Sequence, residues 1–357
     1  MTTETTLARM TREHPRTALW NDSADPEQLR RSIAFGARGA TCNPVIALAA
    51  VRADLPRWTE RLRALADERP SAGESELGWA VVEELSVEAA RLLEPAFEAT
   101  GGRDGRLSIQ TDPRLHRDAR ALVAQAERFA SLAPNVIVKI PATATGLEAI
   151  EEATFRGISI NATVSFTVAQ AVAVAEAVER GLDRRAAAGL PVTEHGSVAT
   201  IMGGRLDDWL KAVTERQGLL LTPGVLDWAG VAALKRAHTV FRERGYRTRV
   251  LSAAFRNRLQ LTELVGGDLV ISPPFEWQER INASCDRLPA RIDVPVDGAV
   301  LGELLDRVPE FRRAYEPDGL RVEEFEQFGA TRRTLRQFLD ADAQLDALVR
   351  DVLVPAA

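Results

Sequence analysis

The chain has 357 residues, and its 45 Lys and Arg against 51 Asp and Glu give a formal net charge of −6. This balance argues against sequence-independent nucleic-acid binding, which needs clustered basic surface, so we expect no nucleic-acid partner. The first residues lack an apolar signal-peptide core and no apolar run approaches membrane-spanning length, which predicts a cytoplasmic protein without a membrane partner. Two cysteines and four scattered histidines have no metal-ligand spacing, so we expect no metal.

Short apolar runs alternate along the chain with segments in which apolar residues recur three and four apart. The helix-like segments include 78–100 and 167–182, and Asp112 before Pro113 predicts the start of a helix over 112–131. The predicted strands are 17–22, 39–43, 106–111, 135–141, 158–166, 197–202, 249–255 and 268–273.

Strands that alternate with helices predict a parallel sheet, and eight repeats favour a closed barrel. We therefore predict an α/β fold, a single (β/α)₈ TIM barrel domain over 1–357 with a mostly helical C-terminal extension over 277–357 packed on the barrel. A doubly wound open sheet is the alternative, but no G-x-G-x-x-G follows an early strand. Residues 332–351 are typical of an amphipathic helix. Two roles stay open for this helix: it forms an oligomer contact, or it covers the mouth of the site.

Polar side chains stand where the predicted strands end, and a barrel of this class carries its chemistry at those ends. An apolar strand that merely ends in a loop does not require such a set. For each residue, the alternative is a helix N-cap or a polar loop group. These residues are Asp22, Asn43, Gln110, Lys139, Asn161, Thr163, Thr200 and Arg256.

Lys139 interrupts a buried-strand sequence, Val-Ile-Val-Lys-Ile, in a chain that has only two other lysines, Lys211 and Lys235. Burial without a partner lowers the pKa of an ammonium and makes the neutral amine accessible. A neutral amine is the nucleophile that forms a Schiff base with a carbonyl substrate. The alternative is a lysine that forms a buried ion pair with Asp22.

The chain resembles transaldolases over most of its length, because several motifs occur in the order of that family. The resemblance implies a (β/α)₈ barrel and a class I mechanism that moves a dihydroxyacetone unit from a ketose phosphate to an aldose phosphate without a cofactor. The partners would be small-molecule sugar phosphates, and the oligomeric state stays open. The motifs are NDSAD, GATCNPVI, LSIQTDPRL, VIVKIPATATGLEAI, ISINATVSFTVAQA, GGRLDDW, AAFRN and FGATRRTLRQFL.

By this resemblance, the catalytic residues lie on the early and central strands. Lys139 would form the Schiff base, and Asp22 would move the proton of the hydroxyl beside the cleaved bond. Asn43 and Asn161 would bind the dihydroxyacetone hydroxyls. Thr163 would help to hold the catalytic water.

The substrate phosphate would lie between Arg205 and Arg256, because guanidinium suits phosphate geometry, although a surface salt bridge is the alternative for each. Arg256 is predicted to stand at a helix start, where the dipole adds to its charge. Thr200, assigned to substrate binding, stands where the family usually has serine. Ala254 replaces a serine that commonly binds phosphate.

Gln110 is the main departure from the family pattern, since transaldolases usually carry a glutamate there. Glutamine can hold the relay water but cannot take its proton near neutral pH. Fructose-6-phosphate aldolases also have glutamine, but they usually pair it with a tyrosine at the position of Met202. Two alternatives to transfer therefore stay open: a lyase or specialised-sugar aldolase that releases free dihydroxyacetone, and a non-catalytic barrel that binds sugar phosphates.

Overall fold

The computed structural model describes residues 4–23, 25–192 and 196–355, so that Ala24 of the NDSAD motif and His195 lie outside the described residues. Every observed strand lies within a range predicted from the sequence. The strands are β1 (Thr17–Leu19), β2 (Gly39–Thr41), β3 (Arg106–Gln110), β4 (Val136–Pro141), β5 (Ile160–Thr163), β6 (Val198–Ile201), β7 (Arg249–Ser252) and β8 (Leu269–Ile271).

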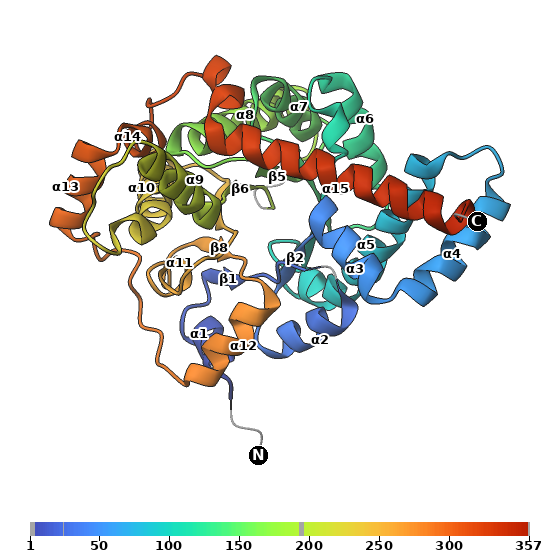
Figure 1. The fold of residues 1–357 in the computed structure, drawn as a ribbon, viewed down its shortest axis with the longest axis horizontal. Helices are drawn as coiled ribbons and strands as arrows, with labels where there is room; N and C mark the ends of the chain where they lie inside the picture. The colour runs from blue at the N-terminus through green and yellow to red at the C-terminus, as the bar shows by residue number, and fades with distance from the viewer. Residues whose placement is uncertain (1–3, 24, 193–195, 356–357) are drawn as a thin grey trace.

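In the part of the chain that is described, these strands form one eight-stranded parallel sheet in the order β1-β8-β7-β6-β5-β4-β3-β2. The first and last strands of this order also meet, because Asn21 bridges to Ala40 and the Asn21 N–H donates to the Gly39 carbonyl at 2.8 Å. Helices surround the strands (Figure 1). The predicted (β/α)₈ barrel is confirmed.

Helices follow most strands, and further helices extend the chain beyond β8. The α-helices are α1 (Thr6–Glu13), α2 (Pro26–Ala34), α3 (Pro44–Ala53), α4 (Leu55–Glu68), α5 (Glu74–Ala99), α6 (Ala119–Ala130), α7 (Ala144–Phe155), α8 (Val168–Ala187), α9 (Gly203–Arg216), α10 (Ala229–Arg244), α11 (Leu259–Thr262), α12 (Phe275–Ser284), α13 (Gly298–Arg307), α14 (Pro309–Tyr315) and α15 (Gly329–Leu353). The 3₁₀ helices are η1 (Pro113–Leu115), η2 (Val225–Trp228) and η3 (Val322–Gln327).

The predicted helix over 112–131 is wrong in its first part. The α-helix begins at Ala119, where the Asp118 carboxylate accepts the Ala121 N–H at 3.0 Å. Asp112 instead caps the short η1 turn by accepting the Arg114 N–H at 2.9 Å. Two aspartates offered the same capping signal, and the sequence pattern did not distinguish which of them begins the longer helix.

The barrel interior is filled near its centre by an apolar cluster that includes Trp20, Ile137 and Leu251. Trp20 needs Gly39 on the neighbouring strand, since a Cβ at Gly39 would lie 2.5 Å from the indole ring. The cluster is separate from the larger core between strands and helices. The interior is therefore packed, and polar chemistry is left to the carboxyl ends of the strands.

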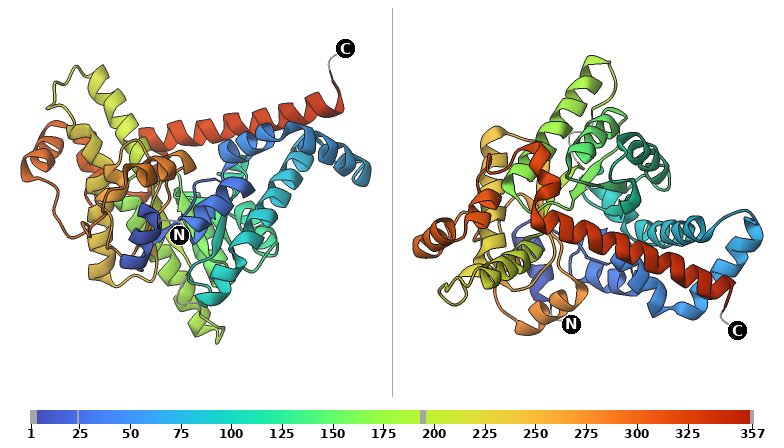
Figure 2. Two further views of the ribbon diagram at one scale, coloured as in Figure 1. Left: turned by 90° about the horizontal axis from the view of Figure 1, so that it is seen from below. Right: turned by 45° about the horizontal axis from the view of Figure 1, so that its top comes forward.

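The helix α15 crosses the molecule at the carboxyl end of the barrel (Figures 1 and 2). It packs against α3, η1 and α9, each of which directly follows a strand, and against α5. Its buried side chains include Phe338 and Leu345, while its opposite side carries charged residues. The predicted amphipathic helix over 332–351 is thus observed. The division into one domain with an extension from 277 stays a prediction.

Candidate active site

Lys139 lies in β4 with its side chain buried, at 3% exposure. It stands abreast of Gln110 on β3 and Asn161 on β5, because these residues are partners in the strand register. Burial lowers the pKa of its amine, and the charge of Asp22 opposes that shift. Within the described residues Lys139 forms no ion pair, so the alternative of a buried ion pair with Asp22 lacks support.

Asp22 follows β1 at the same end of the barrel and is partly buried. Its backbone N–H donates to the Pro273 carbonyl at 3.2 Å, and its carboxylate accepts a hydrogen bond from the Thr41 hydroxyl. We did not single out Thr41 from the sequence. The signal was the alternation within 39–43, which places Thr41 and Asn43 on the same face of the strand.

Asn161 is held from both ends of its side-chain amide. It donates to the Ser108 hydroxyl at 2.9 Å, and its carbonyl oxygen accepts from the Thr200 hydroxyl at 2.7 Å. All three residues are buried. Thr200 therefore orients Asn161, whose second N–H has no partner in the described part of the chain. Ser108 was not predicted, although it lies two residues before Gln110 and thus on the same face of β3.

Asn43 is the N-cap of α3, as the alternative interpretation proposed. Its side-chain oxygen accepts from the backbone N–H groups of Val45 at 2.9 Å and Ile46 at 3.0 Å. Capping uses only the oxygen, so the amide NH₂ takes no part in the cap. One residue thus serves the helix and has donors left for a ligand.

Two buried oxygens near Lys139 have no protein partner among the described residues. They are the side-chain oxygen of Gln110 and the hydroxyl of Thr163, which end β3 and β5 on either side of β4. Buried polar atoms are normally hydrogen-bonded, and unpaired ones mark a place where a ligand or water binds. Both residues were predicted to hold water.

Arg205 on α9 is half-buried and is held by α15. Its guanidinium donates to Gln337 at 2.6 Å and Thr334 at 3.3 Å, and it lies 5.3 Å from the ring centre of Phe338. Burial, together with the charge of Arg256, lowers its pKa to about 10. Two neighbouring guanidinium groups, with no carboxylate bound to Arg205 in the described chain, favour an anion between them.

Arg256 does not stand at a helix start, so the predicted dipole contribution is wrong. The helix α11 begins at Leu259, and the Arg256 N–H is already used, because it donates to the Gln260 side chain at 2.6 Å. The loop bends at Ala254, which has a φ of 61°. The Arg256 side chain is exposed and pairs with Asp208 at 2.8 Å, so a phosphate would compete with that carboxylate.

The described residues contain no group of three His, Cys, Asp or Glu side chains placed to hold a metal, and none of their helices is long and apolar enough to span a bilayer. A cavity of about 540 Å³ lies at the amino ends of β7 and β8, beside Arg249 and Asp268. It is at the opposite end of the barrel from Lys139, and its charged lining residues pair with one another, as Arg103 does with Asp268 at 2.7 Å. We place the candidate site at Lys139 on chemical grounds.

The chain was compared with known proteins. Residues 19–288 match the family described as Transaldolase/Fructose-6-phosphate aldolase. A protein named Transaldolase from Thiobacillus denitrificans is 31% identical over 332 residues, which are 87% of this chain and 88% of that protein. Transaldolase 1 of Streptomyces coelicolor is 33% identical over 285 residues, 73% of this chain and 72% of that protein.

A third relative is similar over a shorter stretch. Transaldolase 1 of Streptomyces avermitilis is 41% identical over 155 residues, 43% of this chain. The matched segment spans only 40% of the length of that relative. Similarity is thus higher over part of the chain than over the whole of it.

Proposed function

Because the chain belongs to the transaldolase/fructose-6-phosphate aldolase family, we propose that it transfers a dihydroxyacetone unit between a ketose phosphate and an aldose phosphate through a Schiff base on Lys139. The observation that carries this proposal is the buried amine of Lys139, with its lowered pKa and without an ion pair among the described residues. An idle lysine at this depth would be costly to keep.

In the first step, the neutral Lys139 amine attacks the ketose carbonyl carbon, and loss of water gives an iminium ion. Thr163, with its unpaired buried hydroxyl, and Gln110 would hold the water that carries protons in this step. The free N–H groups of Asn43 and Asn161 would bind the hydroxyls of the dihydroxyacetone unit. Thr200 acts by fixing Asn161.

In the second step, Asp22 takes the proton of the hydroxyl next to the cleaved carbon–carbon bond. The bonding electrons move to the iminium, an enamine forms on Lys139, and the aldose phosphate leaves. The enamine then attacks the aldehyde of the acceptor, Asp22 returns the proton, and water hydrolyses the imine. Arg205 and Arg256 would hold the phosphate of donor and acceptor.

The Schiff base is tested by borohydride reduction in the presence of fructose 6-phosphate, followed by intact-mass measurement and peptide mapping. We expect a dihydroxyacetone-sized adduct on Lys139, because reduction makes the imine permanent. The Lys139→Arg variant should give no adduct, since a guanidinium cannot form the imine.

Lys235→Arg is the matched control, because Lys235 is also buried but is paired with Glu263 at 3.0 Å. It should keep the adduct. A wild-type protein without any adduct, with fructose 6-phosphate and with sedoheptulose 7-phosphate, would contradict the proposal and favour the non-catalytic barrel.

A lyase that releases free dihydroxyacetone is the second candidate, and Gln110 is the observation that favours it. Its amide cannot take a proton, as in the fructose-6-phosphate aldolases. The buried thioether of Met202 counts against the lyase, because it offers no proton where those aldolases usually have a tyrosine. Acceptor dependence separates the two functions. A transferase consumes the ketose phosphate only when an aldose phosphate is added, whereas a lyase releases dihydroxyacetone without one.

We also propose that the substrates are sugar phosphates and that the protein is cytoplasmic. Gln110 would occupy a position at which transaldolases carry a carboxylate. The location rests on Cys42 and Cys285, which are unpaired with each other among the described residues. No cofactor is needed for the steps above, because the amine of Lys139 supplies the electron sink after it forms the iminium.

A further inference from the structure

A small cavity lies behind Gln110, between the barrel and the C-terminal helix. Its volume is about 10 Å³, the size of a single-water site. Its lining includes Gln110 from β3, Trp79 from α5 and Asp342 from α15. Three elements that are far apart in the sequence therefore meet at one point beside Lys139.

The cavity has the polar groups that a bound water requires. The Gln110 oxygen is buried and has no protein partner in the described chain. The buried Trp79 indole N–H lies close enough to Asp342 to lower its pKa, but it makes no hydrogen bond of good geometry within the described chain. Asp342 is buried at 2% exposure. A water molecule there would accept from the indole and donate to the two acceptors, and three hydrogen bonds are typical of a buried water.

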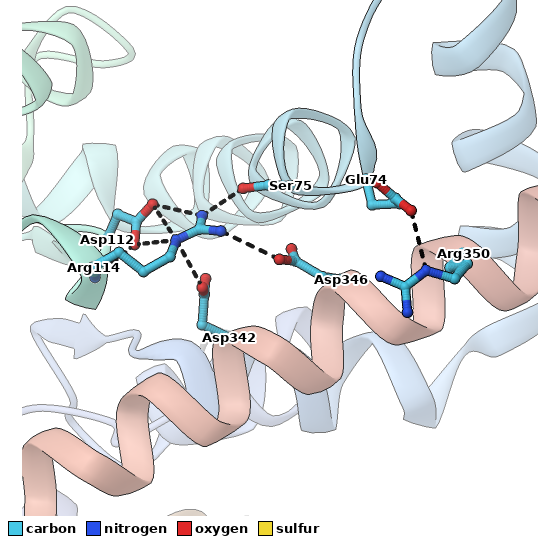
Figure 3. A network of polar contacts seen from close by, with 7 residues as sticks. All are labelled: Glu74, Ser75, Asp112, Arg114, Asp342, Asp346 and Arg350. Atoms are coloured by element: carbon cyan, nitrogen blue, oxygen red, sulfur yellow. Dashed lines mark hydrogen bonds and ion pairs between the residues drawn. The ribbon is translucent and has the colours of Figure 1, made fainter.

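Asp342 is fixed in place by a charged cluster. Arg114 lies among the carboxylates of Asp112, Asp342 and Asp346, at 2.6, 3.0 and 3.2 Å, and also contacts Ser75 (Figure 3). One guanidinium thus serves three carboxylates. Asp342 is the one of the three that lines both this cluster and the cavity behind Gln110.

We propose that Asp342 is a positioning residue that fixes the side chain of Gln110 through a single water bound in this cavity, so that the carboxylate missing from position 110 is supplied by the C-terminal helix. The role in catalysis rests on the proposed function. With its oxygen held toward the cavity, Gln110 presents its NH₂ group as a donor to the water or carbinolamine oxygen at Lys139.

The charges around Asp342 support a role in proton exchange near neutral pH. Burial raises its pKa to about 7, and Asp112 and Asp346 act in the same direction. Arg114 and the indole N–H of Trp79 oppose the shift. These groups come from the β3–η1 segment, α15 and α5. The carboxyl therefore changes charge near pH 7, and the water transmits that change to Gln110.

The experiment compares Asp342→Asn with Asp346→Asn. Asp346 is the matched control, because it sits one turn away on α15 and shares Arg114 but does not line the cavity. We expect Asp342→Asn to lower kcat roughly tenfold with KM nearly unchanged, since misplaced groups cost rate more than binding. The ionisation near pH 7 in the kcat profile should vanish in Asp342→Asn and remain in Asp346→Asn.

A second readout does not depend on turnover. The ¹⁵N–¹H resonances of the Gln110 side-chain amide, assigned by their loss in Gln110→Ala, are followed as the pH is changed. They should titrate with a midpoint near 7 in the wild type and at a lower pH in Asp346→Asn, because the Asp346 charge helps to raise the pKa of Asp342, but they should not titrate in Asp342→Asn. Trp79→Phe should move the midpoint upward, because the indole N–H opposes the pKa shift.

The outcomes separate this inference from the proposed function. If both aspartate variants lose the titration, or neither does, Asp342 does not act on Gln110 and the inference is wrong. If the titration follows Asp342 but borohydride traps no adduct, the positioning role stands and the proposed function falls. If circular dichroism shows that Asp342→Asn is unfolded, Trp79→Phe decides, and an unmoved midpoint overturns the inference.

Discussion

The chemistry of single residues is concentrated in one row across three strands. Gln110, Lys139 and Asn161 are register partners, so an amine stands between two amides at the carboxyl end of the barrel. The Asn161 amide is fixed by one donated and one accepted hydrogen bond, whereas the Gln110 oxygen is unpaired in the described chain. The side of the amine that faces Gln110 is therefore where water and protons would be handled.

We predict that Gln110→Glu raises the rate of transfer about tenfold, because a carboxylate can take the proton of the relay water, and general base catalysis contributes roughly a hundredfold or more before the cost of burying the charge. The acidic limb of the pH profile, on which Lys139 loses its proton and becomes nucleophilic, should also move to higher pH, since a nearby negative charge raises the pKa of Lys139. Initial rates across pH measure both effects.

Gln110→Ala is the control for this prediction and should lower the rate, because it removes both the donor and the acceptor. Equal rates in the wild type, the glutamate variant and the alanine variant would show that position 110 does not act on the relay water.

At the scale of elements, α15 reaches the candidate site twice. It holds Arg205 through Thr334 and Gln337, and it carries Asp342 to the cavity behind Gln110. Its buried face anchors it, since Phe338 is 0% exposed and Leu345 is 3% exposed. Because a packed helix holds its side chains in few rotamers, α15 preorganises groups that a mobile loop would not.

We predict that Arg205→Lys raises KM for a sugar phosphate roughly tenfold to a hundredfold, because a hydrogen bond to a charged group is worth about 1.5–3 kcal/mol. KM for the same sugar without its phosphate should hardly change. Gln337→Ala should raise KM for the sugar phosphate by a smaller factor, because the Arg205 guanidinium would lose the Gln337 side chain that now fixes it.

Arg336→Ala is the matched control on α15, because Arg336 is exposed and pairs with Asp340 at 2.9 Å, outside the site. Its KM should equal that of the wild type. If Arg205→Lys changed KM equally for the sugar phosphate and for the sugar without its phosphate, the phosphate would bind elsewhere.

At the scale of the whole molecule, most charges lie in exposed ion pairs, which contribute little to stability. Buried carboxyl groups matter more. Asp207 is 0% exposed and accepts from the Gly230 N–H and the Gln260 amide, each at 2.7 Å, and burial raises its pKa well above the usual range. Burial also raises the pKa of Asp342, to about 7.

These two groups predict a fall in stability as the pH rises from about 4, the ordinary carboxyl value, to about 7. The sign follows from linkage: between those values the folded protein keeps protons that the unfolded chain has released, so raising the pH favours unfolding. Asp342→Asn should flatten this slope, as measured by denaturant unfolding at several pH values.

Asp306→Asn is the control, because Asp306 is exposed and lies in an ion pair at 3.6 Å. It should leave the slope as in the wild type. An unchanged slope in Asp342→Asn would mean that Asp342 is not protonated more readily in the folded state than in the unfolded chain.

The sequence by itself determined the order and type of the strands, since apolar runs rich in Val and Ile, such as 136–140, are typical of strands buried on both faces of a parallel sheet. It also singled out Lys139, because an amine in such a run has a chemical reason to be there. Local sequence patterns predicted the first residue of a helix less accurately. Asp112 and Asp118 carry the same capping signal, and Arg256 precedes α11 by a turn whose N–H groups Gln260 already occupies.

Only the tertiary structure decided which residues share the site. Thr41 and Ser108 contact the candidate site through hydrogen bonds, and Asp342 lines a cavity with Gln110 although it lies more than two hundred residues away along the chain. The physical reason is one of range: strand and helix patterns report interactions between near neighbours, whereas burial, pKa and the pairing of a distant carboxylate depend on which surfaces the folded chain brings together.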